Sequence, residues 1–127
     1  MVAWENEAAH TGLGRNGAGA AEWPEVLQKA HELVAEGFIQ VVAIFSHLSC
    51  TSEADDLNQI ARFEAACDQA KSAGIDFELR HLVASDGLLR YPQAHYEMVR
   101  IGVALYGLSP FVENSAADFG LVPAMTA

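Results

Sequence analysis

Two long stretches of the chain repeat apolar side chains every three or four positions, with polar residues between them. Residues 24–37 (PEVLQKAHELVAEG) predict a helix, since proline suits a first helical turn and glycine commonly follows the last. Residues 52–74 predict a second helix, which opens on acidic residues and closes on Lys71 and Gly74. Residues 86–90 predict a short helical turn. The apolar side chains expected to face the core from the two long helices are Val26, Leu27, Ala30, Leu33, Val34, Leu57, Ile60, Ala61, Cys67 and Ala70.

Three further stretches, 38–49, 77–85 and 98–107, predict strands. The first and the last are almost continuously apolar, so we expect them to be covered on both faces. Because strands and helices alternate, the strands are expected to run parallel through right-handed crossovers. The chain has 127 residues, whereas a closed eight-stranded (β/α) barrel takes about 250. We therefore predict an α/β fold, a partial (half) TIM (β/α) barrel with parallel strands and outer helices; a doubly wound sheet is the alternative.

Composition narrows the class of protein. A net charge of −10 argues against nucleic acid and anionic membranes as partners, because nothing clusters positive charge on one face. No stretch is apolar enough to span a bilayer, and the first residues lack the pattern of a secretory signal, so a cytoplasmic protein is expected. Cys50 and Cys67 do not form a CxxC pair, and we expect both to be buried or semi-buried thiols without a metal.

Polar residues stand where each predicted strand ends, which is where ligands gather in parallel α/β folds. Ser46 and His47 end one strand and Ser85 ends the next, while Arg15 lies in a glycine-rich loop. Each signal is weak alone, since a histidine there is commonly a hydrogen-bonded structural residue and a serine before a helix is commonly an N-cap.

Arg100 is the sharpest of these signals because it interrupts an apolar run. A buried guanidinium requires a partner. The predicted strands supply few acids, since Glu78 is the only one inside a strand and Glu97 just precedes the last strand. A neutral group such as His47, together with a ligand, is the alternative partner. Gly102 follows on the same face of the predicted strand and leaves space beside the cation. That space suits an anionic or electron-rich ligand.

Five motifs of the chain, taken together, resemble the alanine racemase family, in the central part of its barrel that binds pyridoxal 5′-phosphate (PLP). The motifs are TGLGRNG (11–17), FSHLS (45–49), ARFEAA (61–66), RHLVASDGLLRYP (80–92) and MVRIGVALYGLSP (98–110). The resemblance implies a partial PLP-binding barrel over residues 1–110, with an atypical start at 1–9. Residues 111–127 are then an exit segment toward a C-terminal region.

The resemblance also implies roles for individual residues. Arg100 matches the arginine that faces the pyridine nitrogen of the cofactor, and His47 the histidine that orients this arginine. Ser85, with the backbone of Gly102 and Val103, matches the cradle of the cofactor phosphate. In the family, the arginine matched by Arg15 helps to hold the substrate carboxylate and the phenolic oxygen of PLP; no metal is implied.

Two catalytic groups of the family have no match here. The lysine that forms the Schiff base precedes all matched motifs, and Lys29 and Lys71 fall on outer helix faces. The tyrosine base comes from a separate C-terminal domain of a partner subunit. The resemblance therefore implies a fragment of an alanine racemase, the enzyme that interconverts L- and D-alanine for the cell wall, inactive alone.

Two alternatives remain open. One is a half-barrel that binds phosphate or PLP noncovalently, and the other is a self-associating barrel fragment without catalysis. Exposed strand edges predict a homo-oligomer or pairing with a complementary fragment. Alanine is the small-molecule partner that the family implies.

Overall fold

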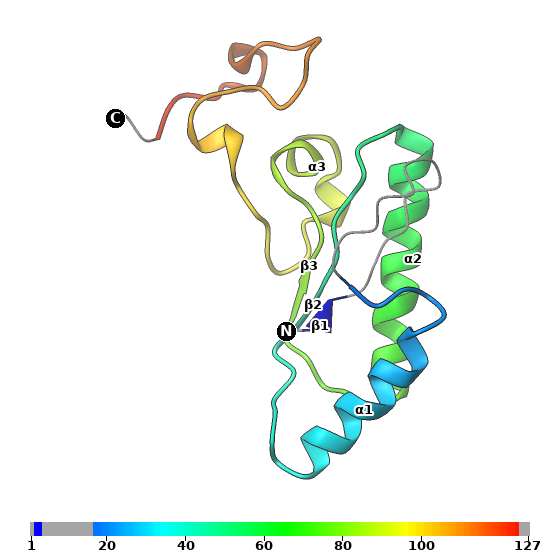
Figure 1. Cartoon of the computed structure of the whole chain (residues 1–127). Coiled ribbons are helices and arrows are strands. Elements are labelled where there is room, and N and C mark those ends of the chain that lie inside the picture. Colours follow the sequence, from blue (N-terminus) through cyan, green and yellow to red (C-terminus); the bar gives the residue numbers. More distant parts are fainter. Residues whose placement is uncertain (1, 4–16, 125–127) are drawn as a thin grey trace.

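The computed structural model describes residues 2–3 and 17–124, and these form a parallel sheet with helices outside it. Strands β1 (Val2–Ala3), β2 (Ala43–Phe45) and β3 (Leu79–His81) lie in the order β1-β2-β3, and both pairs are parallel. Helices α1 (Trp23–Ala35) and α2 (Glu53–Ser72) lie on one side of the strands, and the chain after β3 lies on the other (Figure 1). This arrangement confirms the predicted α/β class of a partial barrel.

The two long helices begin and end where local signals predict. Pro24 stands in the first turn of α1, and the side-chain hydroxyl of Ser52 caps α2 by accepting the N–H of Asp55 at 3.1 Å. Gly37 and Gly74 follow α1 and α2 with φ of 77° and 76°. Each donates its N–H to a carbonyl three residues back, and the next residue reaches five back, which closes both helices as Schellman motifs.

The inward face of α2 is rotated from the predicted one. Ile60, Cys67 and Ala70 are buried as expected, but Leu57 is 45% exposed and Ala61 is also exposed. In their place the core receives Phe63, Ala66 and two polar residues, Asp56 and Gln59. The apolar pattern alone misplaced this face because it assigned polar residues to solvent. On α1, Leu27 and Ala30 are buried as predicted, whereas Val34 is 38% exposed.

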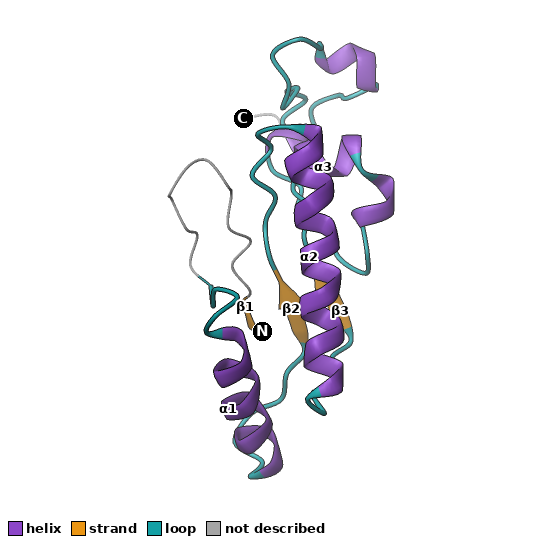
Figure 2. Ribbon diagram, turned by 90° about the vertical axis from the view of Figure 1, so that its right-hand side faces the viewer, coloured by secondary structure: helices purple, strands orange, loops and turns teal. Residues whose placement is uncertain are grey.

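Trp23 joins the two long helices. Its side chain is fully buried, and its indole Nε1 donates a hydrogen bond to the carbonyl of Ala66 at 3.2 Å. This bond satisfies the one polar atom of a large apolar group. Figure 2 shows α2 running in front of β2 and β3, with α1 below β1. The helices and strands together enclose one apolar core.

The strands are shorter than the sequence predicts, and two stretches do not have the predicted structure. Phe38, at the start of the expected strand 38–49, is 74% exposed, so that end is not covered on both faces. Met98 forms only an isolated parallel bridge with His81, and residues 103–105 form a 3-10 helix rather than strand. The interior of the expected strand 98–107 therefore does not pair throughout.

A hydroxyl group accounts for the end of that pairing. Met98 N–H donates to Arg80 O at 3.2 Å and Arg100 N–H to Val83 O at 3.1 Å, so the two acceptors are three residues apart where a regular parallel ladder has two. The next amide in phase, Gly102, donates instead to the side-chain oxygen of Ser85 at 3.0 Å. Backbone pairing stops there, and the chain turns away.

The chain after this turn is held by a few specific contacts. Residues 116–119 form a 3-10 helix with a capping box between Ser115 and Asp118, and Tyr106 forms an antiparallel bridge with Pro123. Cys67 is buried as expected, whereas Cys50 is exposed, contrary to expectation, since it lies in the loop before α2. Within the described ranges, no helix has both the length and the apolar character that crossing a membrane requires.

Candidate functional site

The guanidinium of Arg100 is anchored at the carboxyl ends of β2 and β3. Nη1 donates to the carbonyl of Ser46 at 3.2 Å and lies 3.0 Å from Nε2 of His81. Nη2 donates to the carbonyls of Ser46 at 3.2 Å and Leu82 at 2.9 Å, and lies 2.5 Å from Nδ1 of His47. The cation that interrupts the apolar run is thus held by carbonyl and imidazole groups from two strand ends.

These contacts define the proton positions of the two histidines. An arginine only donates hydrogen bonds, so Nδ1 of His47 and Nε2 of His81 accept. A neutral ring then carries its proton on the other nitrogen. For His81 that atom is Nδ1, which is buried and has no partner among the described residues. Burial, followed by the charges of Arg100 and His47, lowers the pKa of His81.

A second group of polar atoms lies two residues beyond the backbone pair of Arg100 and Val83, at Gly102 and Ser85. Ser85, almost fully buried at the start of α3 (Ser85–Arg90), accepts the N–H of Gly102 at 3.0 Å and of Ala104 at 3.5 Å. A Cβ at Gly102 would lie 4.0 Å from the Ser85 oxygen. Glycine therefore leaves open the space beside the Ser85 hydroxyl. Because the two amides donate to its oxygen, the hydroxyl hydrogen remains to donate to an anion.

The two acids considered as partners of Arg100, Glu78 and Glu97, lie elsewhere. Glu97 forms a two-pronged ion pair with Arg80, with Nη2 at 2.6 Å and Nε at 3.0 Å from its oxygens. The hydrogen bonds from Arg80 lower the pKa of Glu97 to about 2. Glu78 is exposed. Of the two partners left open for Arg100, the structure favours the imidazole of His47.

The structure brings four of the predicted residues together as two pairs, Arg100 with His47 and Ser85 with Gly102. Val103 begins the 3-10 helix 103–105 and is 44% exposed. The amide described as reaching Ser85 is that of the next residue. Arg15 lies outside the described residues. Lys29 and Lys71 are exposed, as expected for outer helix faces.

Sequence reasoning missed His81, which contacts Arg100 directly. The sequence held a signal for it, because His81 lies inside the predicted strand 77–85, on the same face as Leu79. A histidine that is buried there needs a polar partner. It also missed Asp56 and Gln59, polar residues that α2 turns into the core. No local pattern distinguishes them from solvated helix residues.

The fold and the two polar clusters define a class: a barrel-type α/β protein with a guanidinium and a buried hydroxyl at its strand ends. A family model described as "Alanine racemase, N-terminal domain" matches residues 8–110. The chain belongs to this family.

Comparisons with individual proteins agree. An alanine racemase of Frankia casuarinae is 44% identical over 122 residues, 93% of this chain and 32% of that protein. One of Mycobacterium tuberculosis is 40% identical over 119 residues, 91% of this chain and 30% of that protein. The crystal structure of alanine racemase from Streptomyces lavendulae gives a TM-score of 0.83 at 37% identity, covering 88% of this chain and 30% of that one. The chain thus spans about a third of the length of these relatives.

Proposed function

We propose that this chain provides the phosphate cradle and the pyridine-facing arginine of the PLP site of an alanine racemase, which interconverts L- and D-alanine. The observation that carries the proposal is the double anchoring of Arg100, by Ser46 and Leu82 carbonyls and by two imidazoles, next to the Ser85 cluster. Membership of the family supports it.

Arg100 would donate a hydrogen bond to the ring nitrogen of the cofactor. Because a guanidinium keeps its proton against any base in a protein, that nitrogen would stay unprotonated. When bound, PLP supplies an electron sink for the Cα carbanion, and a neutral ring makes this sink weaker. The task of His47 and His81 is to orient the guanidinium. In the described contacts, each imidazole accepts a hydrogen bond from the guanidinium, and these bonds fix the directions of its remaining N–H groups.

Ser85, Gly102 and the following amides would hold the phosphate group. Ser85 suits this role, because its oxygen accepts two N–H groups at 3.0 and 3.5 Å and its hydroxyl hydrogen remains to donate to an anion. The missing side chain at Gly102 leaves the approach open. Arg15 is proposed to hold the substrate carboxylate. Val103 is proposed to contribute through its backbone.

Catalysis needs a lysine and a tyrosine that we do not assign in this chain. It contains two lysines, Lys29 and Lys71, and both are exposed on helices. We therefore expect the 127-residue chain to bind PLP noncovalently and not to racemise alanine by itself. Assembly with a second copy or a complementary chain, and a place in the cytoplasm, belong to the same proposal.

The test is a titration of the purified chain with PLP, with pyridoxal and with inorganic phosphate, followed by thermal unfolding. PLP and phosphate should raise the melting temperature, and pyridoxal much less. Ser85→Ala should weaken phosphate binding by about ten- to a hundredfold, the value of one or two hydrogen bonds to an anion. Ser72→Ala is the matched control, because that hydroxyl is exposed and bonds only its own helix at Asp68. Equal behaviour of both variants would refute the cradle.

Borohydride reduction tests the assignment of the lysines. After incubation with PLP, the chain should carry no stoichiometric reduced adduct on Lys29 or Lys71. A stable adduct on one lysine, together with racemisation of alanine, would show that the chain contains its own Schiff-base residue.

A further inference from the structure

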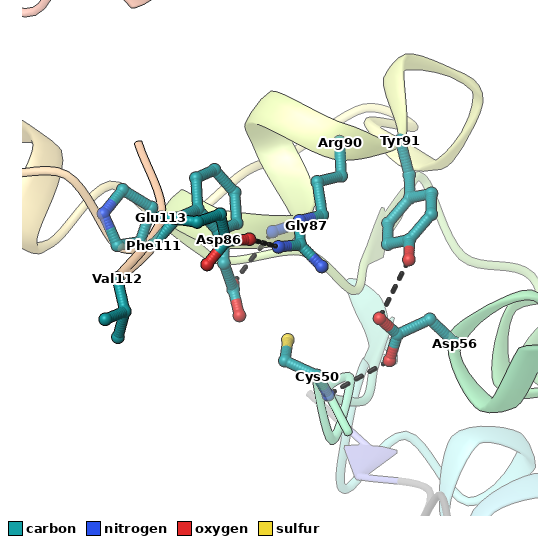
Figure 3. Close-up of a pocket in the computed structure, with 10 residues that line it drawn as sticks. Cys50, Asp56, Asp86, Gly87, Arg90, Tyr91, Phe111, Val112 and Glu113 are labelled. Carbon is teal, nitrogen blue, oxygen red and sulfur yellow. Dashed lines mark hydrogen bonds and ion pairs between the residues drawn. The ribbon is translucent and has the colours of Figure 1, made fainter. Parts of the chain in front are cut away.

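Asp56 is a buried carboxylate outside the proposed cofactor site that joins three elements. It lies in the first turns of α2 and is 1% exposed. Its Oδ1 accepts the backbone N–H of Cys50 at 3.0 Å, and its Oδ2 accepts the hydroxyl of Tyr91 at 2.9 Å. Figure 3 shows both bonds at the wall of a pocket of about 200 Å³. Burial raises the pKa of Asp56, and these two bonds oppose that shift.

The bond to Cys50 supports a strained turn. Cys50 has φ of 55°, a left-handed conformation that is strained for a residue with a Cβ. One turn further along α2, buried Gln59 accepts the N–H of Ser49 at 2.8 Å and donates to its hydroxyl at 2.9 Å. Two buried side chains of α2 therefore hold the loop that begins directly after His47.

The bond to Tyr91 holds the far end of α3. Tyr91 is buried and caps this helix by donating its N–H to Gly87 O at 2.8 Å. A Cβ at Gly87 would lie 2.9 Å from Val83 Cγ1 and 3.1 Å from Leu48 Cδ1, so α3 packs directly on the residue after His47. The first residue of α3 is Ser85. Asp56 thus ties the helix that carries the phosphate cradle to the loop that follows the arginine-binding strand end.

We propose that Asp56 is a positioning residue, which fixes α3 and the loop after β2 so that the Arg100–His47 contact and the Ser85–Gly102 cradle form together. The inference rests on the proposed function for its consequence on cofactor binding. A carboxylate suits the role because both oxygens accept and both partners donate. An asparagine would keep the bond to Cys50 and could donate to the Tyr91 oxygen, so it should restore most of the effect.

The experiment compares Asp56→Ala, Asp56→Asn and Tyr91→Phe in the full chain, with Ile75→Ala as control. Ile75 is buried just beyond the opposite end of α2, so its truncation lowers stability without touching α3 or the loop after β2. Inorganic phosphate affinity and the imidazole NMR resonances of His47 are measured on folded protein. Asp56→Ala should weaken phosphate binding about tenfold, as loss of supporting partners does at other sites, and shift the His47 resonances. Asp56→Asn should stay within about threefold of the unsubstituted chain.

Each outcome bears on the inference. Tyr91→Phe removes a single bond and should give a smaller shift of the same sign, which keeps the test decisive if Asp56→Ala does not fold. Unchanged His47 resonances and affinity in folded Asp56→Ala or Tyr91→Phe would overturn the proposal, as would equal changes in Ile75→Ala. If the unsubstituted chain binds no phosphate, the proposed function fails, but the His47 resonances still decide the role of Asp56.

Discussion

Nη2 of Arg100 lies 2.5 Å from Nδ1 of His47, although 53 residues separate them in the chain. The same nitrogen donates a hydrogen bond to the carbonyl of Leu82, at the neighbouring strand end. A single side chain therefore joins the ends of β2 and β3 to the segment that follows. Its described partners are carbonyl and imidazole groups, which all accept hydrogen bonds from the guanidinium.

Replacing Arg100 should destabilise the fold as well as the site. Arg100→Ala leaves the carbonyls of Ser46 and Leu82 without their donor, and the free energy of unfolding should fall by about 2–3 kcal/mol. The loss in Arg100→Lys should be smaller than in Arg100→Ala but still measurable, because an ammonium cannot span the same acceptors. Urea unfolding followed by the fluorescence of buried Trp23 measures this.

Arg90→Ala is the control for the loss of an arginine. Its ion pair with Glu113 is exposed, so its removal should cost less than about 1 kcal/mol. Equal losses in the two alanine variants would mean that the Arg100 contacts contribute no more than a surface pair.

His81 should make the stability depend on pH. Burial and the neighbouring cation Arg100 lower its pKa in the folded state below 6.5, so below that pH the unfolded chain binds the proton more readily. The free energy of unfolding should therefore fall as pH drops from 6.5, until the folded-state pKa is reached. His81→Gln should remove this slope, as measured by urea unfolding at a series of pH values.

His31→Gln, at an exposed position on α1, is the matched control for that measurement. Retention of the full slope by His81→Gln would assign the pH dependence to other groups.

Of two glycines with positive φ, Gly107 should tolerate replacement by alanine less well than Gly37. Gly37 has φ of 77° and open space around a built Cβ, so Gly37→Ala should cost only the left-handed conformation, about 1 kcal/mol. At Gly107, with φ of 67°, a Cβ would lie 2.6 Å from the backbone nitrogen of Pro123. Gly107→Ala should therefore break the bridge between Tyr106 and Pro123.

Hydrogen exchange at the amide of Ala124, which donates to Leu105 O at 2.8 Å, reports on that bridge. Exchange there should accelerate in Gly107→Ala and stay unchanged in Gly37→Ala. Unchanged exchange in both variants would show that the neighbouring proline shifts without cost.

The amino-acid sequence by itself determined the two long helices and indicated that polar residues gather at the strand ends. Pro24, Gly37 and Gly74 act within one turn of their own helix, so their effect is readable from neighbouring letters. Arg100 stood out because a permanent cation in an apolar run requires partners. His47 and Ser85 stood out at the ends of predicted strands and Gly102 on the face of Arg100, and the family's motifs implied their roles.

Only the tertiary structure decided the strand lengths, the end of pairing at Gly102, the role of His81 and the inward face of α2. A strand exists only where a neighbour accepts its hydrogen bonds, and at Gly102 the acceptor is the Ser85 side chain. Asp56 can enter the core because Tyr91, 35 residues away, donates to it. Burial of a polar group depends on partners distant in the sequence, and no local pattern carries that information.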